Sequence, residues 1–197
     1  MDAIINEITS VIKDNEPEQF TFNLNELPDH NNYRLDIRQF GKFLKVFNSL
    51  NSKTNDCLYW FSVPLKADAQ KLKNEIDKQR EPLKQQQDKR VVPAKNNNID
   101  SNILYVGVRK GGCREYTIIN RKRVPDELSN IAGRIIQHLG YYIKGTTQGL
   151  QLVHWAKMFN IQATLNVIEF QHLQNKEYLY IIEKLYAIKL KPILGKH

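Results

Sequence analysis

The chain has 197 residues, of which 41% are hydrophobic and 25% are charged, and its formal net charge is +8. This length and composition are ordinary for one globular domain with an extension. The sequence contains no apolar run of membrane-spanning length, and its first twelve residues carry acids where a signal peptide would carry cations. A cytoplasmic protein is therefore expected. Two cysteines are too few for a disulfide framework or a zinc cluster.

The positive charge favours a polyanionic partner such as nucleic acid, because basic side chains neutralise phosphates and release counterions. An anionic membrane surface would serve equally well on charge alone. The excess of cations thus indicates the sign of the partner and not the chemistry that the protein performs.

The first third of the chain predicts supporting structure. Residues 2–13 and 38–50 have the apolar periodicity of amphipathic helices, and a Pro- and Asn-rich passage between them includes the alternating Phe20, Phe22 and Leu24. This third has no site signature, and its phenylalanines are interpreted as core.

The next segment, residues 67–87, is rich in Lys, Gln and Glu and predicts a thin amphipathic helix that Pro82 breaks or kinks. Two interpretations of its cations stay open: a phosphate-tracking arm or a solvated helix face of mixed charge. These cations, with those that follow the helix, are Lys71, Lys73, Lys78, Arg80, Lys84, Lys89 and Arg90.

Strands are predicted at residues 57–63 (CLYWFSV), 103–109 (ILYVGVR) and 163–170 (ATLNVIEF) from their apolar and β-branched content, and residues 115–119 are expected to extend a sheet edge. Helices are predicted at 150–159 and 176–190, the latter capped by Asn175. A basic cluster made of Arg121, Lys122 and Arg123 precedes the central helix. The fold class is therefore α+β.

The central helix is predicted over residues 129–142, with Asp126 as its cap and Gly140 as its stop. Arg134 and His138 are four residues apart, so their side chains lie on one face beside the apolar stripe. A cation and an imidazole at the edge of a core suggest an anion site, whereas a solvated polar face is the ordinary alternative.

Glu183 is the second anomaly, because its helical neighbours are mostly apolar or aromatic. A carboxylate in such surroundings costs free energy unless it is paired or holds a cation. Either a buried Glu–Arg pair or a metal ligand would satisfy it.

The order of these features resembles the GIY-YIG endonuclease family. LYW (58–60) stands where the family has GIY, YVG (105–107) where it has YIG, GRIIQHLG (133–140) is similar to its arginine helix, and IEKLYAIKLKP (182–192) to its closing glutamate helix. The sequence departs from the family in lacking its first glycine, in having Gly195 for the tail asparagine, and in placing some forty residues between the tyrosine strands.

The resemblance implies a small three-stranded, mainly antiparallel sheet flanked by helices. It divides the chain into an N-terminal extension, residues 1–50, and a nuclease-like domain, residues 51–197, with a basic helical insertion at about 66–102. It implies metal-dependent hydrolysis of DNA phosphodiesters, of restriction or repair type. One metal site cuts one strand at a time, so cleavage of both strands requires sequential nicks or two protomers, as in a homodimer on duplex DNA.

The family mechanism also assigns roles to residues. Glu183 would hold Mg²⁺ or Mn²⁺, and Arg134 would face the scissile phosphate with two hydrogen bonds. Tyr59 would orient or deprotonate the attacking water, which requires its phenol to be acidified by Arg134 or His138. Tyr105 would assist by a hydrogen bond to the water or to the phosphate. Either tyrosine could instead be a residue of the sheet core. The resemblance does not assign a single role to His138.

Contacts with the nucleic-acid backbone are expected from several basic residues, namely Arg109, Lys110, Arg121, Lys122, Arg123, Lys71, Lys78 and Arg80. The alternative to an enzyme is a non-catalytic nucleic-acid-binding module with a degenerate site. A weaker third alternative is a phosphodiesterase acting on RNA or a small substrate.

Overall fold

The computed structural model describes residues 10, 15–29, 37, 41–86, 89–111, 116–119, 122–125, 130–141, 148–171, 173 and 177–195. The strands are β1 (Glu18–Asn23), β2 (Asp56–Ser62), β3 (Ile103–Arg109), β4 (Tyr116–Ile119), β5 (Lys122–Pro125) and β6 (Gln162–Phe170). The helices are α3 (Gly41–Ser52), α4 (Lys66–Gln85), α5 (Ile131–Leu139), α6 (Leu152–Trp155) and α7 (Tyr178–Leu190), and a 3-10 turn, η1 (Leu24–Glu26), follows β1.

The main sheet has four strands in the order β1-β6-β2-β3, and every neighbouring pair is antiparallel. The α+β class is confirmed, but the expectation of a three-stranded sheet is wrong. The additional strand is β1, which pairs with β6 from Glu18↔Val167 to Asn23↔Gln162. Its alternation buries Phe22 while it covers an edge of β6 that would otherwise expose unpaired backbone groups.

Strands β4 and β5 form a separate two-stranded sheet. Residues 115–119 were expected to extend a sheet edge; residues 116–119 do form a strand, but β4 pairs with the following strand and not with the main sheet. Consequently β3 stays at an edge of the main sheet.

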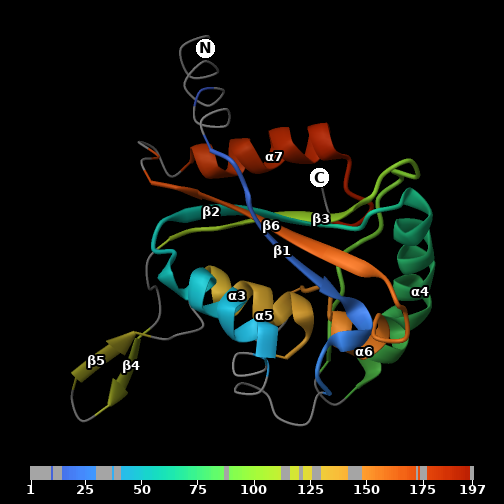
Figure 1. Ribbon diagram of the computed structural model, residues 1–197, viewed down its shortest axis with the longest axis horizontal. Coiled ribbons are helices and arrows are strands. Elements are labelled where there is room, and N and C mark those ends of the chain that lie inside the picture. Colours follow the sequence, from blue (N-terminus) through green and yellow to red (C-terminus); the bar gives the residue numbers. More distant parts are fainter. Residues whose placement is uncertain are drawn as a thin grey trace.

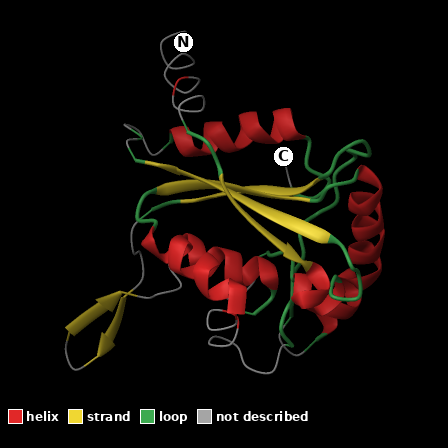
Figure 2. Ribbon diagram, in the orientation of Figure 1, coloured by secondary structure: helices red, strands yellow, loops and turns green. Residues whose placement is uncertain are grey.

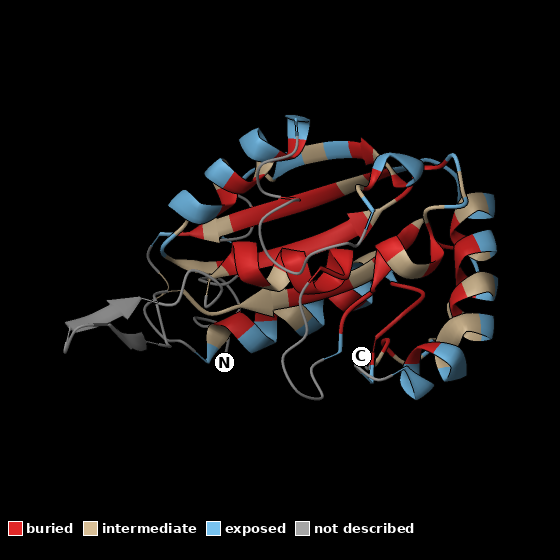
Figure 3. Cartoon of the chain, turned by 90° about the horizontal axis from the view of Figure 1, so that it is seen from below, coloured by how far each residue is buried: buried red, intermediate tan, exposed pale blue. Residues whose placement is uncertain are grey.

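Helices cover both faces of the main sheet, with α7 on one side and α3, α5 and α6 on the other (Figure 1). Figure 2 gives the same arrangement by type of structure. Side chains alternate along β2, so Tyr59 and Phe61 join the cluster beneath α3 and α5, whereas Leu58 and Trp60 join Ile182 beneath α7. Strands β2, β3 and β6 are largely buried, whereas β1, at an edge of the sheet, buries only Phe22 (Figure 3).

The core on the α5 side contains residues from the segment before residue 50 and from the segment after it. Phe22 and Phe43, which pack edge to face with ring centroids 5.6 Å apart, belong to the same buried cluster as Tyr59 and Phe61. The segment before residue 50 therefore contributes directly to the core that supports β2.

Several predicted helix limits need correction. The cap of α5 is Asn130 and not Asp126: its side chain accepts a hydrogen bond from the Gly133 amide at 3.1 Å. Gly140 ends the helix as expected, in the left-handed conformation at φ 101°. Pro82 lies within α4, which continues to Gln85. The helix predicted at 150–159 is only the four-residue α6, and Asn175 lies outside the described residues.

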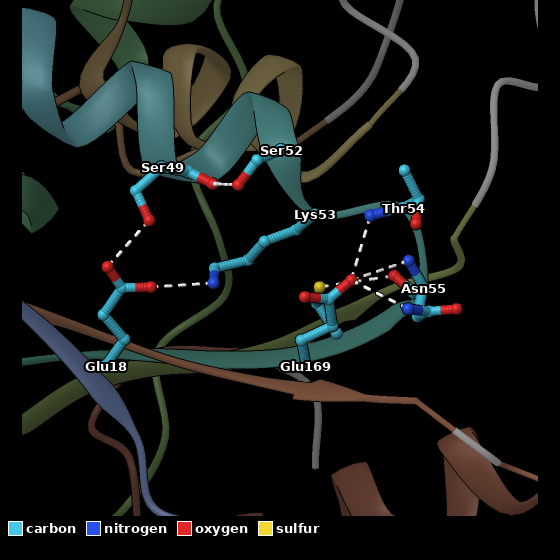
Figure 4. A network of polar contacts seen from close by, with 8 residues as sticks. Glu18, Ser49, Ser52, Lys53, Thr54, Asn55 and Glu169 are labelled. Carbon is cyan, nitrogen blue, oxygen red and sulfur yellow. Dashed lines mark hydrogen bonds and ion pairs between the residues drawn. The ribbon is translucent and has the colours of Figure 1, made fainter.

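A network of polar contacts fixes the start of β2 (Figure 4). The carboxylate of Glu169 on β6 accepts hydrogen bonds from the backbone amides of Thr54 and Asn55, each at 2.9 Å. Glu18 on β1 pairs with Lys53 at 2.7 Å. Because the network joins the turn after α3 to two strands, it sets the position of the strand that carries Tyr59.

Among the described residues, no helix is long and apolar enough to cross a membrane.

Candidate active site

A polar cluster lies where the middle of β2 meets α5. The hydroxyl oxygen of Tyr59 is 3.0 Å from Nε of Arg134, which donates to it, and 2.9 Å from Nε2 of His138. Since Arg134 and His138 are four residues apart on α5, both reach one side of β2. The helical spacing predicted this pairing, and the structure adds Tyr59 as the group that they share.

A backbone contact fixes the protonation of His138. The amide of Leu150 donates to Nδ1 at 3.2 Å, so the proton of the neutral ring lies on Nε2 and is donated to Tyr59. Complete burial, together with the nearby charge of Arg134, holds the pKa of His138 well below its usual value. His138 is therefore a neutral hydrogen-bond donor at neutral pH.

Tyr59 lies beneath the surface, with 0% of its area exposed. Burial raises the pKa of its phenol above the usual value, and the charge of Arg134 only partly opposes this effect. The expectation that neighbouring cations acidify Tyr59 is therefore wrong for the free protein: His138 carries no charge, and desolvation outweighs Arg134. Tyr59 is a neutral acceptor of two hydrogen bonds.

Arg134 is partly exposed but firmly held. Besides its bond to Tyr59, its Nη1 donates to the side-chain oxygen of Gln137 at 3.0 Å and to the carbonyl of Gln148 at 2.8 Å. Burial disfavours its charge, but the hydroxyls of Tyr59 and Tyr105 more than compensate, so the pKa of Arg134 is raised. Nε and Nη1 are thus engaged within the protein, and a further side-chain hydrogen bond joins the guanidinium to Tyr105.

Tyr105 extends this cluster toward solvent. Its ring stacks on that of Tyr59 with centroids 6.2 Å apart and lies 4.7 Å from that of His138, yet the side chain is only half-buried. Of the two tyrosines, Tyr105 is therefore the one that reaches the surface, whereas the family resemblance gave the main role to Tyr59.

Gly107, opposite Tyr59 in the β2–β3 register, explains the closeness of the two rings. A Cβ at this position would lie 2.6 Å from the Tyr59 hydroxyl and 2.8 Å from the Tyr105 ring. Only glycine leaves this space, so the last residue of YVG is part of the site. This role of Gly107 was not among the predictions, although the YVG motif contains the residue.

Glu183 comes from α7, on the other face of the sheet, and is half-buried. Burial raises the pKa of its carboxyl, while the charges of Arg134 and Lys184 lower it. Glu183 in turn opposes ionisation of Tyr59. Because Arg134 shifts the pKa of Glu183 and Glu183 shifts the pKa of Tyr59, these residues share one electrostatic environment. Among the described residues, Arg134 is the cation that opposes the effect of burial on Glu183 most strongly, so the alternative of a Glu–Arg interaction stays open.

The side chains available as metal ligands near Glu183 determine which kind of metal site is possible there. The described residues contain no group of three or more His, Cys, Asp or Glu side chains that could hold a metal ion. A single carboxylate oxygen, supplemented by water and phosphate oxygens, is a recognised environment for Mg²⁺. Glu183 therefore fits a site of the expected kind and does not fit a multi-ligand metal cage.

The residues expected to contact nucleic acid are dispersed. Arg109 ends β3, and Nζ of Lys110 lies 4.9 Å from the ring centroid of Tyr180. Arg121 lies outside the described residues, and Lys122 and Arg123 are described only as backbone of β5. None of these contacts is tested by the structure, and they stay predictions.

On α4, the exposed Lys71 and Lys78 pair with acids one turn earlier, Asp68 and Glu75. Arg80 also donates to the carbonyls of Val92 and Pro93, which ties the following segment to the helix. Paired charges of both signs are typical of a solvated helix face, and they favour this interpretation over that of a phosphate-tracking arm.

Two other cations of this segment are structural. Lys73 is buried and donates to the carbonyls of Asn96 and Asn98, and the buried Arg90 donates to the Gly140 carbonyl at 2.9 Å and to Gln151 at 2.8 Å. Residues 66–102 are consequently integrated into the fold, and Arg90 supports the end of α5.

Comparison with known proteins finds no matching family model, no matching curated protein and no matching solved structure. The interpretation of the site therefore depends on its own residues and geometry.

Proposed function

We propose that the protein is a metal-dependent endonuclease that hydrolyses DNA phosphodiester bonds. The observation that carries the proposal is the association of Tyr59, Tyr105, Arg134 and Glu183, which come from four separate elements, β2, β3, α5 and α7. Tyr59 and Arg134 are joined by a hydrogen bond, Tyr105 stacks on Tyr59, and Arg134 lowers the pKa of Glu183. A cation, a half-buried phenol and a carboxylate within electrostatic reach of the cation suit a phosphodiester and its attacking water.

In this mechanism Arg134 is the residue that contacts the phosphate. Its fixed charge stabilises the negative charge that increases on the phosphoryl oxygens as water attacks phosphorus and the bond to the leaving 3′ oxygen breaks. Nε and Nη1 are engaged by Tyr59, Gln137 and Gln148, and Tyr105 is a further hydrogen-bond partner of the guanidinium, so direct hydrogen bonds to the phosphate require at least one of these contacts to open. The two hydrogen bonds from Arg134 to the phosphate that the family resemblance implies would require the contact with Gln148 to open.

The two tyrosines have different roles in the proposal. Tyr105 is half-buried, and its hydroxyl, a hydrogen-bond partner of Arg134, can donate to a phosphate oxygen. The proton that the attacking water loses passes through solvent to the leaving 3′ oxygen. Tyr59 is buried and acts as a positioning residue, since its oxygen holds Nε of Arg134 and Nε2 of His138. His138 positions Tyr59 in turn and does not serve as the base, because its unprotonated Nδ1 accepts from the Leu150 amide and the ring is buried.

Glu183 would hold one divalent cation, Mg²⁺ or Mn²⁺, through a carboxylate oxygen. When bound, such an ion stabilises charge on the leaving oxygen and on the phosphoryl group. Burial raises the pKa of Glu183, so the carboxyl must lose its proton before it can serve as a ligand, and metal binding weakens as the solution becomes more acidic.

The second candidate is a non-catalytic nucleic-acid-binding module. The observation that favours it is the complete burial of Tyr59, the residue to which the family resemblance assigned activation of water. Incubating the purified protein with supercoiled plasmid, with Mg²⁺ or with chelator, separates the two functions. Nicked or linear plasmid with Mg²⁺ alone supports the enzyme, whereas binding without any strand break supports the module.

A further inference from the structure

Helix α7 has a second apolar face that the sheet does not use. Its inner side packs Leu179, Ile182 and Tyr186 against the sheet. On the opposite side, Ile181, Leu185 and Ile188 recur at i, i+4 and i+7 and are 42%, 44% and 72% exposed. A contiguous stripe of this kind on a surface helix indicates a surface that another segment covers.

The rim of this stripe is mainly basic, although the exposed Glu177 lies at its N-terminal end. Lys184 and Lys189 flank it along the helix, and Lys191 follows at its end. A second copy of α7 laid against the stripe would bring like charges together, which disfavours self-association. An acidic amphipathic partner would match both the apolar face and its rim.

The segment before β1 has this chemistry. Residues 2–13 have the periodicity of an amphipathic helix whose apolar positions are Ile4, Ile5, Ile8, Val11 and Ile12. Asp2, Glu7, Asp14 and Glu16 lie within or beside it, against a single lysine. Ser10 falls on the side opposite the isoleucines, and it is the one residue of this segment that the structure describes: it is helical and exposed.

The connections of the chain permit the contact within one molecule. Glu18, the first residue of β1, pairs with Val167 close to the end of β6, and β6 leads directly into α7. Residues 13–17 can span roughly 17 Å when extended, and α7 is only about 20 Å long. An apolar helix that precedes β1 can therefore reach the stripe.

We propose that residues 4–12 of the same chain dock as an amphipathic helix on the outer face of α7, with Ile8 against Leu185. The contact buttresses the helix that carries Glu183 from the side away from the sheet. It is independent of the proposed nuclease activity, because it depends only on the apolar face and the charge of its rim.

Disulfide trapping tests the pairing directly. Ile8→Cys combined with Leu185→Cys in a Cys113→Ser background is compared with Ser10→Cys combined with Leu185→Cys, which places the thiol on the polar side. Cys57 does not compete, since it is buried and its pKa is raised by burial to about 12. We expect rapid cross-linking within the monomer for the first pair only. Equal rates for both pairs, or cross-linked dimers, would overturn the proposal.

Hydrogen exchange gives a second measurement that needs no cysteine. The amides of residues 4–12 are expected to be protected in the unmodified protein and to lose that protection in Leu185→Asp. Leu65→Asp is the matched control, because Leu65 is also an exposed leucine, at 61%, but precedes α4. The proposal is rejected if these amides exchange freely from the start or if Leu185→Asp leaves their protection unchanged.

Discussion

Nε of Arg134 donates a 3.0 Å hydrogen bond to the hydroxyl of Tyr59, and this hydroxyl has no exposed surface. The bond links α5 to the middle of β2, and it fixes the orientation of a guanidinium that is partly exposed. Tyr59 therefore determines where the charge of Arg134 lies. This relationship makes Tyr59 a support for Arg134, and in the proposed mechanism it is Arg134, Tyr105 and Glu183 that contact the substrate.

Removing the Tyr59 hydroxyl should destabilise the fold. Tyr59→Phe leaves Nε of Arg134 and Nε2 of His138 without their acceptor, at a cost of roughly 1–3 kcal/mol in the free energy of unfolding. Tyr180→Phe, at an exposed tyrosine of α7, should change stability by less than about 0.5 kcal/mol. Urea denaturation of both variants measures the difference. Equal stabilities would show that the shared acceptor is energetically unimportant.

Gly107 should be intolerant of a side chain. Gly107→Ala places a methyl group within 3 Å of both tyrosine rings, so we expect a loss of about 1–3 kcal/mol in stability from overpacking. The closest atom is the Tyr59 hydroxyl at 2.6 Å, and the same substitution should therefore cost less in a Tyr59→Phe background. A thermodynamic cycle of the four proteins measures this coupling, and strict additivity would contradict the explanation.

His138 should make stability depend on pH. Its pKa in the folded protein lies well below the unfolded value of about 6.5, so the unfolded chain binds the extra proton first. The stabilisation is fully present above this pH and is lost as pH falls through the interval between the two values. In His138→Gln the slope of unfolding free energy against pH should flatten below about pH 6.5. An unaltered slope would assign the acid sensitivity to other groups.

The secondary structure of the central region followed from periodicity. Apolar and β-branched content indicated that β2 and β3 are strands, and the spacing of Arg134 and His138 predicted that both lie on one face of α5. The apolar neighbours of Glu183 likewise indicated a carboxylate in unfavourable surroundings, in agreement with the raised pKa that burial gives it. Local patterns are informative here because each reports which side of an element faces the core.

Other features depended on contacts between remote residues. Alternation places Tyr59 on the α5 face, but it does not indicate how deeply that face is covered, and desolvation decides the pKa of the phenol. Lys73 and Arg80 resemble surface cations in the sequence, yet the carbonyls that bind them come from a loop that the helical pattern does not place. The addition of β1 to the sheet similarly depended on pairing with β6.

Arg134→Lys should retain a positive charge and lose activity. A lysine cannot reproduce the fork that joins Tyr59, Gln137 and Gln148, so the charge is no longer held at the phosphate. We expect the cleavage step to slow by roughly 10²–10³-fold, as for loss of a preorganised donor. Arg80→Lys, whose guanidinium binds loop carbonyls, is the matched control and should cleave at the unmodified rate. Equal rates for both variants would remove Arg134 from the chemistry.

The salt dependence of DNA binding tests the cations of α4. If exposed Lys71 and Lys78 bind phosphates, replacing both by glutamine should reduce the slope of log affinity against log salt by about 0.9 for each phosphate that is no longer neutralised. Fluorescence anisotropy with chelator present measures the slope without cleavage. An unchanged slope would assign these lysines to their pairs with Asp68 and Glu75.

The central claim is that Glu183 joins the Arg134 cluster to form a metal-dependent phosphodiesterase site. Single-turnover cleavage of plasmid DNA by the unmodified protein, Glu183→Gln and Glu177→Gln, each with Mg²⁺ and with chelator, tests it most directly. Both carboxylates belong to the same region of α7, but Glu177 is exposed. We predict Mg²⁺-dependent cleavage that Glu183→Gln abolishes and Glu177→Gln leaves intact, with DNA binding in chelator retained by all three. Cleavage by Glu183→Gln at the unmodified rate, or no cleavage by any of the proteins, would contradict the claim.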